Sequence, residues 1–257
     1  PSAYNEAGRG PGGAPPGYCG TGNAKSNGGT HGGIAGSQIQ DRPCFGSVNF
    51  YGSVTQPDMH GSTGSATMMP VDVGGSGGGV IKLSVIGPME NCGIIGAEGV
   101  AGETGYAWAG AGGSIWIEAG SLDGDGVISV NGGRAGSGMG GGGGRVAIYY
   151  DVNQYSGIVS AYGGGIFYGG AGTVYLKRNS DLVGDIVVNN GNRVGQYAQF
   201  PAAHAALSSN VVVENQGVFR HIPGTSLTLL QVDANGGGVF ELGSFTTSSK
   251  TYIPTIN

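Results

Sequence analysis

The chain has 257 residues, among them 58 Gly and 11 Pro, with 39% hydrophobic and 11% charged residues and a net charge of −5. So few charges, together with apolar residues that gather in β-branched and aromatic clusters, exclude a disordered chain, and the absence of a Gly-X-Y period excludes a collagen. The net charge is negative and the chain has no basic stripe, which argues against nucleic-acid binding. No apolar run is long enough for a membrane span.

Residues 1–73 form a Gly- and Pro-rich segment with little periodicity. This segment has too few apolar residues for a core of its own, so we expect it to lie irregularly on the rest of the chain. Cys19 and Cys44 are candidates for a disulfide within it, which leaves Cys92 free or paired outside this sequence. The chain begins PSAYNEAGRG without a Met, as expected for a processed product or an excerpt of a longer chain.

Four strand-like segments follow, each with a glycine pair or near-pair, one variable residue and then alternating apolar residues. They read GGGVIKLSV from 77, GGSIWIEA from 112, GGRVAIYY from 143 and GAGTVYLK from 170. Alternation with period two is typical of strands with one buried face. The residues predicted to point inward are Ile81, Ile115, Val146 and Val174, which are 34, 31 and 28 residues apart. Such a near-constant period indicates a stacked-repeat protein.

Each segment is followed by a second, shorter strand that opens with glycine. These strands read GIIGAEG from 93, GVISVNGG from 126, GIVSAYGG from 157 and GDIVVNNG from 184. We expect glycine to mark corners, positive φ or the close approach of another backbone. The run GMGGGGG from 138 then reads as a loop that leaves the coil and returns to it.

Residues 74–257 are therefore predicted to form one continuous all-β domain, a parallel, right-handed β-helix with long Gly-rich loop excursions. Its later turns are expected to be shorter, because QGVFRHI and GGVFELG align on Val218 and Val239, 21 residues apart. Residues 202–207 are the one segment that could hold a helical turn.

These pieces are similar to known repeat segments both in their sequences and in their order along the chain. The pieces GGTHGG, YGSVTQP, GSGGGVIKLSV, GAGGSIWIEA, GGGGRVAIYY and GGAGTVYLK resemble glycine-rich β-helix segments of very large surface proteins of bacteria and protists, over about residues 28–192. The resemblance implies an extracellular parallel β-helix within an adhesin, a cell-wall-associated protein or a surface filament such as a mastigoneme. It carries over no catalytic residues, because a fold does not define an activity.

The strongest candidates for metal binding or catalysis are Asp123 and Asp125, which are two residues apart at a turn in SLDGDGV. Such a pair could bind Ca²⁺ or act as acid and base. An Asp-Gly turn, in which the side chains bond their own backbone, is the favoured explanation. His31 and His60, with Asp58, are likewise better explained as turn residues than as metal ligands. We therefore predict no catalytic residue, metal or cofactor.

Two rows of side chains are expected to face outward. One, with no shared chemistry, consists of Val80, Ser114, Arg145 and Thr173. The other contains Trp116 and Tyr175, whose rings could stack on sugars or pack against a neighbouring molecule if they are exposed. The alternative is that glycine-rich loops cover this aromatic row.

The leading hypothesis is a non-catalytic extracellular structural module that builds or spaces a surface filament or giant adhesin. Its partners would be neighbouring copies or flanking domains, because unpaired strands at the ends of a stack invite association. The alternative is a β-helix that binds or cleaves polysaccharide, with carbohydrate as its partner.

Overall fold

The computed structural model describes residues 5–6, 10–13, 28–36, 49–67, 74–103, 107–134, 139–166, 168–201, 208–221 and 228–242. Every regular element within these ranges is a β-strand. The proposed disulfide partners Cys19 and Cys44, and residues 202–207, lie outside the described residues.

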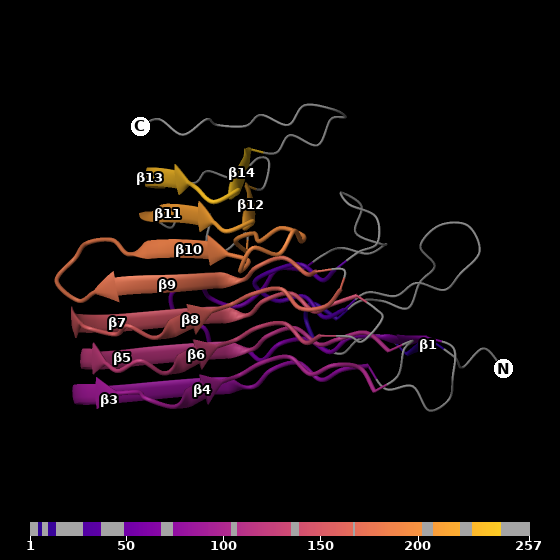
Figure 1. Ribbon diagram of the computed structural model, residues 1–257, viewed down its shortest axis with the longest axis horizontal. Helices are drawn as coiled ribbons and strands as arrows, with labels where there is room; N and C mark the ends of the chain where they lie inside the picture. The colour runs from indigo at the N-terminus through magenta and orange to yellow at the C-terminus, as the bar shows by residue number, and fades with distance from the viewer. Residues whose placement is uncertain are drawn as a thin grey trace.

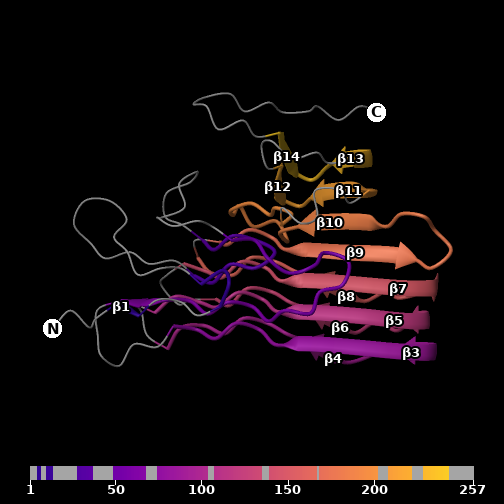
Figure 2. The same cartoon turned by 180° about the vertical axis from the view of Figure 1, so that it is seen from behind.

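Half of the fourteen described strands belong to one seven-stranded mixed sheet with the order β13-β11-β10-β9-β7-β5-β3 (Figures 1 and 2). Its strands are β3 (Val80–Glu90), β5 (Ser114–Asp123), β7 (Arg145–Asn153), β9 (Thr173–Arg178), β10 (Asp185–Asn189), β11 (Ser208–Glu214) and β13 (Thr228–Ala234). A parallel three-stranded sheet consists of β4 (Ile94–Gly96), β6 (Val127–Ser129) and β8 (Ile158–Ser160). The two-stranded sheets pair β12 (Val218–His221) with β14 (Val239–Leu242) and β1 (Asn5–Glu6) with β2 (Ala66–Thr67).

The four predicted repeat strands are present and stack in the predicted register. β3, β5, β7 and β9 are parallel, and Ile81, Ile115, Val146 and Val174 lie directly opposite one another in that order. These side chains share a core with the three-stranded sheet, whose Ile128 is fully buried. Period-two burial of β-branched residues on one face accounts for this part of the fold.

The predicted parallel β-helix is wrong as a description of the whole fold. The strand from GDIVVNNG, β10, does not extend the row β4-β6-β8; it turns back and pairs antiparallel with β9, with Ile186 opposite Tyr175. Among the described residues, the result is a set of separate mixed, parallel and antiparallel sheets without a closed solenoid. Gly184 permits this reversal, because a Cβ there would lie 2.5 Å from the Tyr175 ring.

The buried face of the large sheet changes at β9. Before it, the strands bury their inward row against β4, β6 and β8. Beyond it, the strands bury the opposite face in a second core, which contains Ile186, Val188, Val211, Val213, Phe200, Phe219 and Phe240 together with Tyr175 and Val54. Because β10 reverses with its apolar residues on the Tyr175 side, these residues are buried only where a second layer packs on that face. Burial of apolar area is the main stabilising term.

The glycine-rich segments form a bundle at one end of the strands, where the chain runs on without strand arrows (Figure 1). Within residues 108–113, successive N–H groups donate to segments 62–65, 139–142 and 97–100, and then to the same three again. The pairs are Trp108 to Ser65, Ala109 to Met139, Gly110 to Val100, Ala111 to Ser62, Gly112 to Gly142 and Gly113 to Ala97. A period of three residues is that of an extended helix of the polyproline II type, which makes no internal hydrogen bonds. Neighbouring backbones therefore bond residues 108–113 on three sides.

The polyglycine run lies inside this bundle, and its prediction as an excursion loop is wrong for residues 139–144, which are all buried. A Cβ on Gly143 would lie 1.9 Å from the Ala161 carbonyl oxygen, and one on Gly112 would lie 1.8 Å from that of Val130. Only glycine allows backbones to approach this closely, and this explains why the chain tolerates the conformational entropy of so many glycines.

Candidate functional site

Residues 49–62 lie across the outer face of the large sheet, near the start of its strands. Tyr149 Oη donates to the Thr55 carbonyl at 2.9 Å, and Ser114 Oγ donates to the Met59 carbonyl at 2.5 Å. Val54 is fully buried against this face. We call residues 49–62 the strap, because they run over the strands and bond to them from outside.

Arg145 faces outward from the first core, as its place in the alternation predicts, but the strap covers it. The side chain is 0% exposed, and Ser114 and Thr173 in the same row are buried as well. Its Nε donates to the Tyr51 carbonyl at 2.8 Å and its Nη1 to Thr173 Oγ1 at 3.0 Å. No described carboxylate forms an ion pair with it, and Nη2 has no hydrogen-bond partner. Burial lowers the Arg145 pKa, because a charged guanidinium is poorly solvated there.

His31 packs beside this arginine and is also 0% exposed. Its Nδ1 lies 2.9 Å from the Gly112 carbonyl, so Nδ1 carries the proton and donates it, while Nε2 has no partner. Its ring stacks on Tyr51 with centroids 4.5 Å apart. Burial first, and the charge of Arg145 second, lower the His31 pKa to about 3. The imidazole is therefore neutral and packs on Tyr51. Within the described residues it belongs to no group of three His, Cys, Asp or Glu side chains that could hold a metal ion.

Tyr51 joins the strap to the histidine. Its Oη donates to the His60 carbonyl at 2.9 Å and lies 2.7 Å from Ser62 Oγ. Burial raises the Tyr51 pKa to about 12, so the phenol stays protonated and neutral. The strap is thus held by a neutral Tyr–His stack next to an arginine with which no described carboxylate forms an ion pair.

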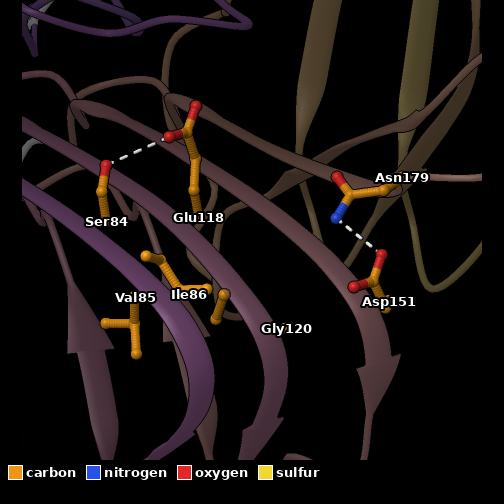
Figure 3. Close-up of a pocket in the computed structure, with 8 residues that line it drawn as sticks. Ser84, Val85, Ile86, Glu118, Gly120, Asp151 and Asn179 are labelled. Atoms are coloured by element: carbon orange, nitrogen blue, oxygen red, sulfur yellow. Dashed lines mark hydrogen bonds between the residues drawn. The ribbon is translucent and has the colours of Figure 1, made fainter.

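A shallow groove of about 260 Å³ opens on the same outer face, further along the strands (Figure 3). Two polar pairs flank it: Ser84 Oγ donates to Glu118 Oε2 at 3.1 Å, and Asn179 Nδ2 donates to Asp151 Oδ1 at 2.8 Å. The lining residues are Ser84, Val85, Ile86, Glu118, Ala119, Gly120, Asp151 and Asn179. Carboxylates and hydroxyls beside apolar surface can accept and donate hydrogen bonds to a ligand rich in hydroxyl groups.

The structure separates the predicted site residues from this groove. Asp123 and Asp125 are exposed at the end of β5, and Asp123 Oδ1 accepts the Gly124 N–H at 2.6 Å. Gly124 has a φ of +108°, so the pair occupies a turn of the kind in which an Asp bonds its own backbone. Within the described ranges, no three His, Cys, Asp or Glu side chains gather closely enough to hold a metal ion.

The two predicted surface aromatics differ in environment. Tyr175 is 4% exposed and meets Tyr149 edge to face with centroids 5.7 Å apart, so it belongs to the second core. Trp116 is half-buried, and Lys82 Nζ stands 3.5 Å above the centre of its ring. A cation over an aromatic face is an attractive contact that leaves little of this ring for sugars.

The sequence predicted unpaired strands at the ends of the stack, and β3 and β4 form one such end. β3 is the outermost strand of its sheet and β4 is the outermost strand of the smaller sheet. Ile86 is fully exposed and Ile94 is 79% exposed. Exposed and half-buried residues alternate along the whole of β3, and no described strand lies beyond β3 in the sheet.

Searches of protein-family models, of curated proteins and of solved structures find no match to this chain. No helix in the described part of the chain is long and apolar enough to cross a membrane.

Proposed function

We propose that this chain is a structural module that builds or spaces a larger extracellular assembly, with neighbouring copies or flanking domains as its partners. The observation that carries the proposal is the open end at β3 and β4. A strand with a free edge is a template for pairing with another chain. Here the free edge belongs to an 11-residue strand and lies beside exposed isoleucines.

The interior of the module suits a mechanical role. The strands β3, β5, β7 and β9 pair in parallel ladders, with one shift of register between Val85 and Pro88. In the glycine-rich bundle, backbone hydrogen bonds join residues 108–113 to neighbours on three sides. Such a bundle resists shear because a segment cannot slide without breaking bonds to several neighbours at once, each worth about 1 kcal/mol net.

Solution assembly tests this proposal. The purified chain, a 25.5 kDa polypeptide, is examined by size-exclusion chromatography with light scattering across a concentration series, and the largest species are imaged by electron microscopy. We expect particles that grow from monomers into dimers or longer stacks. A chain that stays monomeric up to its solubility limit would contradict the proposal. An antibody against the chain should also label intact, unpermeabilised cells.

A second candidate function is polysaccharide binding in the groove. The observation that favours it is the placement of Glu118 and Asp151 on opposite flanks of one open groove. A screen against neutral and acidic polysaccharides tests it. If a glycan binds, Glu118→Gln should weaken binding, whereas Asp123→Ala, outside the groove, should leave it unchanged. Equal affinity in both variants would rule out this groove.

A further inference from the structure

The free side of β3 carries a regular set of unpaired backbone groups. The Ser114 N–H donates to the Gly79 carbonyl at 3.0 Å, and the Asn91 N–H donates to the Asp123 carbonyl at 3.0 Å. Both β3-side residues are odd-numbered, so the odd positions of this edge bond toward β5. In an extended strand, alternate residues point their N–H and C=O groups to opposite sides. The register with β5 shifts between Val85 and Pro88, but the exposure of β3 itself alternates without interruption across this point. The even positions from 80 to 90 therefore face away from β5, where no described strand lies.

The side chains of β3 alternate in the same way. Exposure alternates without interruption along the 11 residues, from Val80 to Glu90. The odd row is half-buried over the first core, and its members are Ile81, Leu83, Val85 and Met89. The even row is exposed; it contains Lys82 near one end, Glu90 at the other and Ile86 midway between them. The edge thus has opposite charges placed symmetrically about Ile86.

We infer that this edge pairs with the same edge of a second copy, antiparallel about a two-fold axis at Ile86. The inference rests on the proposed function and names its contact. In this register Lys82 lies opposite Glu90 of the second copy, Leu83 lies opposite Met89, and Ile86 meets its own equivalent. Two opposite-charge pairs and two Leu83–Met89 apolar pairs then form at once, and such pairs stabilise an antiparallel pair of strands.

Neighbouring registers do not offer this match. A shift of the axis by one residue places Lys82 opposite Pro88 or Cys92 and leaves Glu90 without a cation. Pro88 has no N–H, so its pairing with Ser84 keeps one of two possible hydrogen bonds. Lysine and proline on an edge normally discourage indiscriminate pairing. Here they select one register, because only the Ile86-centred register satisfies both charges.

A charge exchange tests the pairing. Lys82→Glu and Glu90→Lys each place like charges opposite each other twice in the dimer, so each should raise the dissociation constant at least about tenfold, which corresponds to about 1.4 kcal/mol. The double variant should restore the dissociation constant to within about threefold of the parent value. Additive losses in the double variant would overturn the inference.

Cross-linking locates the contact directly. Position 80 lies opposite position 92 of the second copy in this register, and Cys92 is exposed and free. Val80→Cys should therefore yield an intermolecular disulfide between residues 80 and 92 on mild oxidation, identified by mass spectrometry. Leu230→Cys, on the exposed face of β13 at the opposite end of the sheet, is the matched control and should give none with Cys92.

The outcomes separate the two proposals. A disulfide between residues 230 and 92 would show head-to-tail stacking, so the β3 pairing would fail while the structural role survived. Particles that form without any disulfide between residues 80 and 92 would lead to the same conclusion. A chain that is monomeric in every variant would overturn both.

Discussion

Replacing Gly143 by alanine should disrupt the glycine-rich bundle. The new Cβ would lie 1.9 Å from the Ala161 carbonyl oxygen and 2.5 Å from the Gly172 nitrogen. Both atoms belong to backbone, so a segment must withdraw by about 1.5 Å before ordinary contact distances return.

The cost follows from the hydrogen bonds that such a movement breaks. The Gly143 N–H donates to the Gly170 carbonyl at 2.9 Å, and the Gly172 N–H donates to the Ala161 carbonyl at 2.7 Å. On its other side, the Gly143 carbonyl accepts from Gly33 at 2.9 Å. Loss of two such bonds, with their buried groups left unpaired, lowers the free energy of unfolding by about 3–5 kcal/mol. That is a large part of the 5–15 kcal/mol typical of a folded domain.

Urea denaturation followed by far-ultraviolet circular dichroism measures this change. Gly79→Ala is the matched control, because a Cβ there meets nothing within 4 Å. The control should leave stability unchanged or raise it by about 0.4–1 kcal/mol, since alanine restricts the unfolded chain. If Gly143→Ala unfolded within about 0.5 kcal/mol of the control, the close backbone approach that we describe would be refuted.

Three further predictions concern the strap and the turn after β5. Burial lowers the His31 pKa to about 3 in the folded state, whereas the unfolded chain has the ordinary pKa of about 6.5. Between these two values only the unfolded state binds the proton. The free energy of unfolding should therefore fall as the pH drops from about 6.5 toward 3, by up to about 5 kcal/mol. Urea midpoints across this range should show a steeper fall for the parent than for His31→Gln, and parallel curves would contradict the assignment. Arg145→Met replaces an uncompensated buried charge by an apolar chain of similar length and should destabilise less than Arg145→Ala, which also leaves a cavity; thermal unfolding in the opposite order would indicate a counter-charge that we have not identified. Asp123→Asn should cost at most about 1 kcal/mol and should leave the melting temperature equally insensitive to Ca²⁺, whereas a Ca²⁺-dependent rise in the parent alone would establish a metal site.

The sequence by itself determined the strands that repeat and the side chains that they bury. Ile81, Ile115, Val146 and Val174 were identified as one inward row from alternation and period, and they lie opposite one another in the structure. These signals are local, because a strand with one buried face must alternate and a stacked repeat must recur. The Asp-Gly turn after β5 was readable for the same reason, since an Asp side chain that bonds the next backbone group needs no distant partner.

In segments whose side chains show no periodic pattern, only the tertiary structure decided which segments are neighbours. Glycine has no side chain to show which way it faces, so the three-sided bonding of residues 108–113 could not be seen in the polyglycine run. The reversal of β10 depended on the Tyr175 ring and on aromatic residues far along the chain that form the second core. Arg145 looked outward by its place in the alternation, and only the strap, from nearly a hundred residues earlier, buries it. Each of these outcomes depends on contacts between residues that are far apart in the sequence. Such contacts exist only once the chain has folded, so no local pattern of residues predicts them.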